Sequence, residues 1–258
     1  MRMTRLAPAL LLFAGCVEDL KVIRLKADGS GTIVYTRRMK EWAVETARKS
    51  GAVDEFTEEK ARERIAELGQ GVALVSTEKA NRDGWIGMTS TYSFKDVTKL
   101  KLDGTDTTIQ AENLANGNQK LTIAYRWKSS PADAKAKEMK ASEEVKRALF
   151  SGMKFSVAVE VDGTIVKSSS PHFDGARLTV LEIDLDQLFA EEARLKKKAA
   201  EEPATLAEAL DVIQALQLLN TLNGGAKELD EVRQALGKIK GIKHALEPQV
   251  TLEWTPKK

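Results

Sequence analysis

Apolar and polar residues alternate with a period of two over several short stretches of the chain, which predicts β-strands. The clearest are 120–128 (KLTIAYRWK) and 153–161 (MKFSVAVEV), in which every second residue is apolar. Similar patterns predict strands over 21–25, 32–36, 72–78, 85–94, 164–168, 177–185 and 249–254. Asp-Gly or Asn-Gly pairs, which favour tight turns, stand near many of these segments. We therefore expect an antiparallel sheet of hairpins.

Other segments predict helices between the strands. Residues 38–50 and 57–68 are rich in Ala, Glu, Lys and Arg, and 130–150 starts with a Ser-Pro pair typical of a helix N-terminus. From 186 to 246 nearly every residue is compatible with a helix. The sequence thus predicts an α+β fold, in which helices pack on the antiparallel sheet and a further helical segment lies near the C-terminus.

The first sixteen residues, MRMTRLAPALLLFAGC, have the layout of an export signal. Two arginines precede an apolar run, and the small residues Ala14 and Gly15 lead to Cys16, the one cysteine of the chain. The run is shorter than the roughly 20 residues of a membrane-spanning helix. Its end resembles the bacterial lipobox. The resemblance implies that 1–15 is a signal peptide and that Cys16 carries acyl chains after cleavage.

Lipidation at Cys16 would determine where the protein is located. Each buried methylene contributes about 0.8 kcal/mol, so two or more acyl chains attach a protein stably to a membrane. The membrane is accordingly the first expected partner, held through lipid on Cys16. In lipoproteins of Gram-negative bacteria, a residue other than Asp after the cysteine implies the outer membrane, facing the periplasm, and Val17 stands there.

We expect four regions along the chain. They are the signal peptide 1–15, an α+β lipoprotein domain at 16–185, a helical subdomain or insertion at 186–246, and a final strand and tail at 247–258. Within the third region, leucines and Ile213 recur at helical spacing from Leu206 to Leu222. Such a stripe is usually the buried face of an amphipathic helix, but it also fits a protein or lipid partner bound through 186–246.

Charge and composition exclude several classes of function. The chain has 40 basic and 38 acidic residues, and removing residues 1–15 leaves 38 of each. A balanced chain has no strong field for nucleic acid, so we expect no nucleic-acid partner. A single cysteine excludes internal disulfides and thiolate zinc clusters. The two histidines, His172 and His244, lack a metal-ligand spacing, so we expect no metal and no cofactor.

The segment ADGSGTI at 27–33 resembles part of a calcium-binding loop. Aligned on Asp28 and Ser30, such a loop would need oxygen ligands at its first and twelfth positions, which here are Lys26 and Arg37. Two cations in the place of carboxylates argue against calcium. The segment instead predicts a hairpin turn.

A second segment, SSSPHFDG at 168–175, places serines beside His172 and Asp174. An envelope hydrolase would use these two residues with a serine from elsewhere in the chain. The chain has no G-x-S-x-G motif, and the segment lies between two predicted strands, so a solvated loop is the plainer interpretation. We therefore predict no catalytic residues and no enzyme, with the hydrolase as the alternative.

Several stretches together are similar to bacterial lipoproteins with an LppM-type domain, whose biochemical function is unassigned. They are STYSFKDVTKLKL (90–102), LFSGMKFSVAVEVDGTIVKSSS (149–170) and GARLTVLEIDLDQLF (175–189). The resemblance covers roughly 21–189, implies an α+β domain outside the inner membrane, and transfers no catalytic residue. We expect a membrane-anchored extracytoplasmic lipoprotein with a non-catalytic binding or envelope-structural role.

Overall fold

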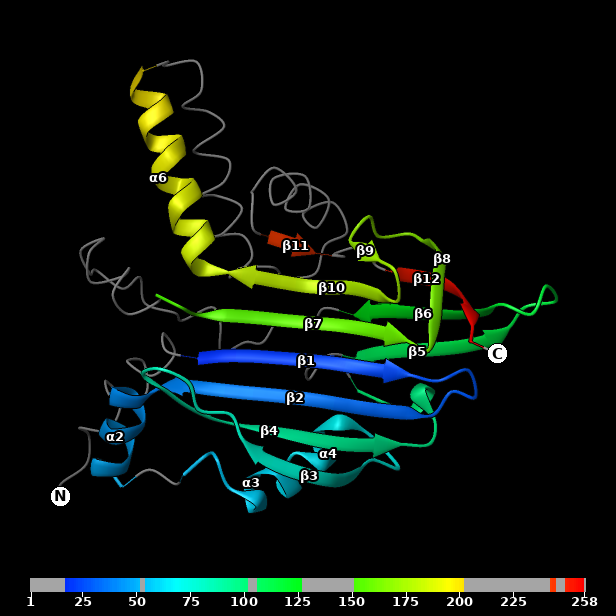
Figure 1. Ribbon diagram of the computed structural model, residues 1–258, viewed down its shortest axis with the longest axis horizontal. Helices are drawn as coiled ribbons and strands as arrows, with labels where there is room; N and C mark the ends of the chain where they lie inside the picture. Colours follow the sequence, from blue (N-terminus) through cyan, green and yellow to red (C-terminus); the bar gives the residue numbers. More distant parts are fainter. Residues whose placement is uncertain are drawn as a thin grey trace.

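The fold is seen in a computed structural model of the chain (Figure 1). It describes residues 17–51, 54–101, 106–126, 151–201, 242–244 and 249–257. The signal peptide and Cys16, the predicted helix at 130–150 and the leucine stripe at 206–222 lie outside these residues. Those features stay predictions, as does the division into four regions.

A large sheet of eight strands dominates the structure (Figure 1). Seven follow the order β11-β10-β7-β1-β2-β4-β3, and β9 pairs with β10. Their bounds are β1 Val17–Leu25, β2 Gly31–Lys40, β3 Ala73–Lys79, β4 Trp85–Phe94, β7 Lys154–Val161, β9 Phe173–Asp174, β10 Arg177–Asp184 and β11 Ile242–His244. Neighbouring strands run antiparallel, except that β1 and β7 run parallel. Strand β1 therefore lies inside the sheet, paired on both sides.

A second sheet of four strands has the order β5-β6-β12-β8. Its strands are β5 Asp106–Asn113, β6 Gln119–Arg126, β8 Gly163–Ser168 and β12 Gln249–Pro256. The chain passes from the large sheet to this one at Asp162, between β7 and β8. Strand β12 confirms the strand expected at 249–254, and it pairs with both β6 and β8.

The main core contains side chains from both sheets. Ile23 and Val159 of the large sheet belong to the same buried cluster as Leu121, Leu252 and Trp254 of the second sheet. All five are at most 1% exposed. Burial of this kind contributes about 25 cal/mol per Å² of apolar surface, so the contact between the sheets stabilises the fold.

Helices are few. They are α2 Glu41–Lys49, α3 Glu58–Glu63, α4 Ile65–Leu68 and α6 Leu185–Glu201, with a 3₁₀ turn η1 at Val97–Lys99. The Thr57 side chain caps α3 by accepting a hydrogen bond from the Lys60 backbone N–H. The Tyr92 hydroxyl of β4 donates to the carbonyl of Ala61, which ties α3 to the large sheet. Among the described residues, no helix combines the length and apolar character needed to span a membrane.

The predicted α+β class is wrong, because the described part of the chain is mainly β, with two sheets and short helices. Residues 38–40 extend β2 and pair with β4 instead of starting a helix. The helix expected over 57–68 is two short helices that meet at Arg64. Strand β5, with the polar sequence DTTIQAEN, was not predicted. At 38–40 and in β5, strand pairing outweighs local helix propensity or a weak apolar pattern.

Candidate functional site

The inward face of β1 and β2 changes from apolar to polar along its length. Ile23 faces the core and is 1% exposed. The next inward pairs along the ladder are Lys21 with Tyr35 and Asp19 with Arg37. Alternate residues of a strand point to the same face, so these charged residues share the face of Ile23. Lys21 is only 6% exposed, which places a cation in a position normally apolar.

Tyr35 lies at the centre of this polar region. Its hydroxyl donates a hydrogen bond to the Asp19 carboxylate. The Arg64 guanidinium lies 4.5 Å from the ring centroid, and the Lys21 ammonium lies 5.7 Å from it. Burial, together with the negative charge of Asp19, raises the pKa of Tyr35 above its usual value. The phenol therefore stays protonated and keeps Asp19 in place as its acceptor.

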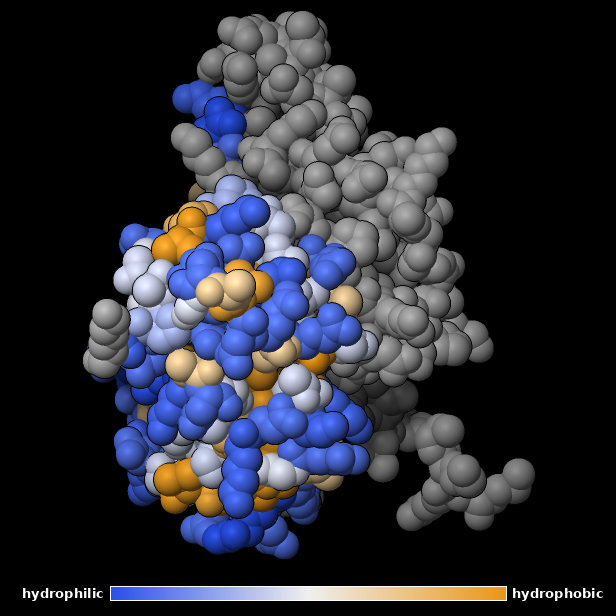
Figure 2. All heavy atoms as spheres, turned by 90° about the vertical axis from the view of Figure 1, so that its right-hand side faces the viewer, coloured by the Kyte–Doolittle hydropathy of each residue, from blue (hydrophilic) through white to orange (hydrophobic). Residues whose placement is uncertain are grey.

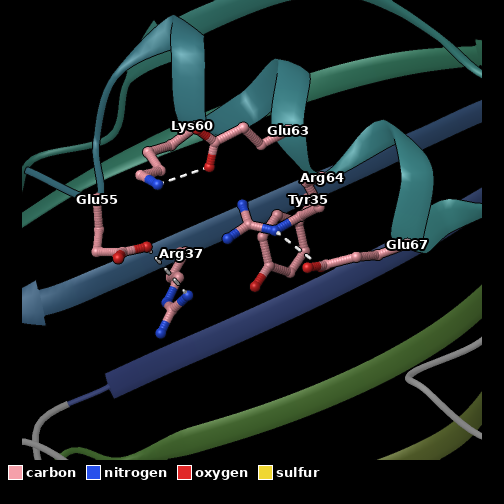
Figure 3. A pocket seen from close by; sticks show the side chains of 7 residues that line it. All are labelled: Tyr35, Arg37, Glu55, Lys60, Glu63, Arg64 and Glu67. Atoms are coloured by element: carbon pink, nitrogen blue, oxygen red, sulfur yellow. Dashed lines mark hydrogen bonds and ion pairs between the residues drawn. The ribbon is translucent and has the colours of Figure 1, made fainter.

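A cavity of about 340 Å³ lies between this region of β2 and the helical segment at 55–67 (Figure 3). The lining residues are one aromatic, three basic and three acidic, namely Tyr35, Arg37, Glu55, Lys60, Glu63, Arg64 and Glu67. The Tyr35 ring is the only apolar surface among these side chains, and Arg64 lies over it (Figure 3). The cavity suits a small charged molecule and not an acyl chain.

The cations of the cavity differ in how tightly they are paired. Lys60 Nζ is 2.6 Å from Glu63, and this hydrogen bond raises the pKa of Lys60. Arg37 and Arg64 are 3.9 and 4.0 Å from the nearest oxygens of their carboxylate partners, beyond hydrogen-bond distance. The Nε atom of Arg37 is buried and has no hydrogen-bond partner within the described residues. A buried donor without an acceptor is costly, so the surroundings of Arg37 do not serve the stability of the fold alone.

Two guanidinium groups define the chemistry that this cavity offers. Arginine presents several N–H donors in a planar fork that matches the oxygens of a carboxylate or phosphate. Arg37 comes from the central part of the sheet, and Arg64 from the junction between α3 and α4 (Figure 3). An anionic group between them would accept hydrogen bonds from the two guanidinium groups without breaking the tight Lys60–Glu63 pair.

His172 and Asp174, the residues of the hydrolase alternative, do not line this cavity. His172 lies just before β9, where its backbone N–H donates to Ser170 Oγ at 3.3 Å. Partial burial, with Lys243 nearby, lowers the pKa of the imidazole. Asp174 is exposed in β9. The hydrolase alternative and the absence of catalysis both stay predictions.

Asp28 and Ser30 form the turn between β1 and β2. Asp28 Oδ1 accepts hydrogen bonds from the backbone N–H and the hydroxyl of Ser30, at 2.9 and 2.6 Å. The hydroxyl bond, followed by the backbone one, lowers the pKa of Asp28. Gly29 has φ 81°, the left-handed conformation that such a tight turn requires. Across the described ranges, no group of three or more His, Cys, Asp or Glu side chains could hold a metal ion.

The charged cavity was not anticipated from the sequence. A signal for it was present in β1, where Asp19 and Lys21 fall on the inward positions that Ile23 and Leu25 continue. Charged residues in phase with a core stripe indicate either a paired network or a binding site. The other half of the cavity comes from Arg64 and its neighbours in the sequence, which only the folded chain brings to β2.

Comparison with known proteins shows a similarity of fold and no match of sequence family. A scan against protein-family models finds no match. A search of curated proteins finds no match either. Among solved structures, the chain is similar to the folded domain of LppM from Mycobacterium tuberculosis, determined by NMR, with 8% identity and a TM-score of 0.34. The similarity covers 66% of this chain and 82% of that one. It concerns the fold alone and says nothing of ligand, activity or membrane attachment.

Proposed function

We propose that the protein is a non-catalytic binding lipoprotein of the cell envelope, anchored through Cys16, whose charged cavity takes the anionic group of a small polar ligand. The observation that carries the binding proposal is Arg37, which lines a cavity of about 340 Å³ and whose buried Nε donor has no acceptor among the described residues. The sequence MRMTRLAPALLLFAGC supports the anchor. For a Gram-negative source, Val17 after the cysteine supports the outer membrane, facing the periplasm.

The ligand would be held mainly by two arginines. Arg37 and Arg64 have only long ion pairs to their carboxylate partners, and those partners, Glu55 and Glu67, are partly or largely exposed to solvent. Exposed pairs contribute little to stability, so a carboxylate or phosphate can replace them at small cost. Tyr35 forms part of the lining, and its hydrogen bond to Asp19 keeps the ring in place.

Titration with simple anions tests the binding proposal. The full processed chain in detergent micelles would be titrated with inorganic phosphate and, separately, with acetate, while the Arg37 Nε–H signal is followed by NMR. We expect a saturable shift with one or both anions, and their relative affinities distinguish phosphate from carboxylate ligands. The Arg37→Gln variant should bind neither anion. A folded parent protein that gives no saturable shift with either anion would overturn the proposal.

Arg24→Gln is a matched control for this experiment. Arg24 lies on the same sheet, in β1, but its side chain is exposed and pairs with Glu160 at 3.1 Å. It does not line the cavity. Anion binding should survive this change, because only the arginines of the cavity act as donors.

The anchor has a separate test. Intact mass of the protein extracted from membranes should correspond to a chain that starts at Cys16 and carries acyl groups. The Cys16→Ser variant should lose both the acyl groups and the membrane attachment. A Cys16→Ser protein that matures and stays with membranes like the parent would overturn the anchor and leave the cavity proposal in place.

A further inference from the structure

The end of the large sheet at which β1 begins supports a second inference, which rests on the proposed anchor at Cys16. We propose that this end of the sheet lies directly on the bilayer that holds the acyl chains, with Trp42 of α2 among the lipid headgroups. The surface consists of the end of β2 at Lys40, the start of α2 with Trp42, and Arg82 in the turn before β4. Val17 and Trp85 are buried beside it.

The first argument is the absence of a spacer between the anchor and the fold. Strand β1 begins at Val17, the residue that follows Cys16 in the sequence. Val17 is buried and pairs with Met39 of β2, so its position in the sheet is fixed. One residue of chain reaches at most about 3.6 Å. Acyl chains on Cys16 would therefore hold this end of the sheet, and no other part of it, at the membrane surface.

The second argument is that α2 is joined firmly to the anchored strand. A small buried cluster contains Val17, Met39, Ala43 and Val44, from β1, β2 and α2. The backbone N–H at the first residue of α2 donates to the Gly84 carbonyl at 2.9 Å, which links the helix to the turn before β4. Figure 1 shows α2 beside the start of β1 and the end of β2. A membrane contact at Cys16 would thus bring α2 with it.

The third argument is the chemistry of the exposed side chains. Trp42 is 47% exposed, which is unusual for so large an apolar residue. Lys40 Nζ and the Arg82 guanidinium lie 4.3 and 5.2 Å from the centre of the Trp85 ring. Tryptophan and long basic side chains are favoured where water meets lipid, because each has an apolar body and a polar or charged tip. Arg82 also pairs with the buried Glu18 at 3.3 Å, so anionic phosphate headgroups would complement mainly Lys40.

The opposite end of the molecule has a different surface. Figure 2 faces the end that lies to the right in Figure 1 and shows mostly hydrophilic residues with apolar ones scattered among them. Strand β8 lies at that end, and its Val166 is 53% exposed. Isolated exposed apolar residues of this kind are normal on a protein surface in water.

This orientation also places the cavity close to the membrane. Arg37 pairs in register with Asp19, three residues after Cys16, which corresponds to about 10 Å along a strand. The ligand would therefore be bound within a few residue lengths of the headgroups, and not at the end of the domain that faces away from the membrane.

A depth-dependent quencher tests the contact. The lipidated protein would be reconstituted into vesicles of phosphatidylethanolamine and phosphatidylglycerol that contain a lipid with a nitroxide headgroup. With Cys16 acylated, a cysteine introduced by Glu45→Cys provides the one free thiol for a fluorophore, on the exposed side of α2 one turn from Trp42. Val166→Cys is the matched control at the opposite end. We expect several-fold stronger quenching of the probe at position 45 than at position 166.

Two further outcomes separate this inference from the proposed function. A protein that floats with the vesicles but is quenched equally at both positions keeps the anchor and overturns the membrane contact, leaving the Trp42 surface for a protein partner. A protein that carries no acyl groups and does not float overturns the anchor as well. Adding Trp42→Ala should weaken the quenching at position 45, whereas Val75→Ala, which removes another exposed apolar side chain, should not.

Discussion

The inner face of the large sheet has two halves that differ in chemistry although the same strands form both. Towards the end of β1, Ile23 and Leu25 pack in a dry core shared with the second sheet. Towards its beginning, Asp19, Lys21 and the facing residues of β2 form a charged region covered by the segment that contains α3 and α4. The first half contributes to stability by burying apolar surface, and the second contains the buried Arg37 Nε donor, which has no acceptor among the described residues.

The contrast shows how one strand can serve two purposes. Because side chains alternate between faces, a strand needs only a change of residue type every second position to pass from core to site. The dry half stabilises the whole sheet, and it thereby supports the polar half, whose buried charges would not hold the strands together by themselves. Substitutions in the two halves should therefore have different consequences.

The largest expected effect is in the dry half. Ile23→Ala should lower the free energy of unfolding by about 3 kcal/mol, because it removes buried methyl groups and leaves a cavity in the shared core. Denaturant titration measures the change. Val166→Ala, at an exposed position, should change it by less than about 0.5 kcal/mol. Equal effects for the two variants would contradict the assignment of the stabilising core.

A smaller effect is expected at the centre of the polar half. Asp19→Ala should cost about 2 kcal/mol, since it removes the acceptor of the buried Tyr35 hydroxyl. The same change made in a Tyr35→Phe protein should cost less, because no hydroxyl is then left without a partner. Denaturant unfolding of the four proteins gives the coupling. A coupling of zero would show that the hydrogen bond does not stabilise the fold.

The raised pKa of Tyr35 predicts a loss of stability in alkali. In the unfolded chain the phenol ionises near pH 10, whereas burial and then Asp19 keep it neutral at higher pH in the fold. The stabilising contribution is complete below about pH 10 and falls above it by up to about 1.4 kcal/mol per pH unit. Tyr35→Phe should remove this part of the fall. If the free energy of unfolding fell equally with pH for the parent and for Tyr35→Phe in alkali, this assignment would be contradicted.

The smallest effect on stability is expected at Arg37. Arg37→Met keeps an unbranched side chain and removes a buried donor that has no acceptor among the described residues. The free energy of unfolding should therefore change by at most about 1 kcal/mol, in either direction. Binding of anions should nevertheless be lost. Thermal unfolding and the NMR titration check the two parts. A large loss of stability would indicate that Arg37 serves the fold and not a ligand.

Local patterns were sufficient to predict most strands. The strand at 85–94 appears with the predicted bounds, and those at 153–161 and 177–185 differ from β7 and β10 by one residue at one end. The parallel pairing of β1 with β7 could not be read from the sequence, because it joins segments more than 100 residues apart. The helix predicted over 38–50 begins too early for a related reason. Residues 38–40 belong to β2 because they pair with β4, a partner that the local sequence does not reveal.

The candidate site was harder to predict from the sequence than the strands were. Asp28, His172 and Asp174 attracted attention because their neighbours in the sequence suggested known motifs, yet none of them lines the cavity. Arg37 and Arg64 belong to no motif, and they come together only because α3 and α4 fold back over β2. Residue type identifies chemistry within a segment, whereas a cavity depends on which segments meet.

The inner position of β1 has a mechanical consequence. A pull transmitted through Cys16 would act along the axis of a strand that is hydrogen-bonded on one side to β2 and on the other to β7. Such a force loads both ladders in shear, so their bonds resist together and do not open one after another. A tether at Cys16 would thus enter the fold through a strand that is hydrogen-bonded on both sides.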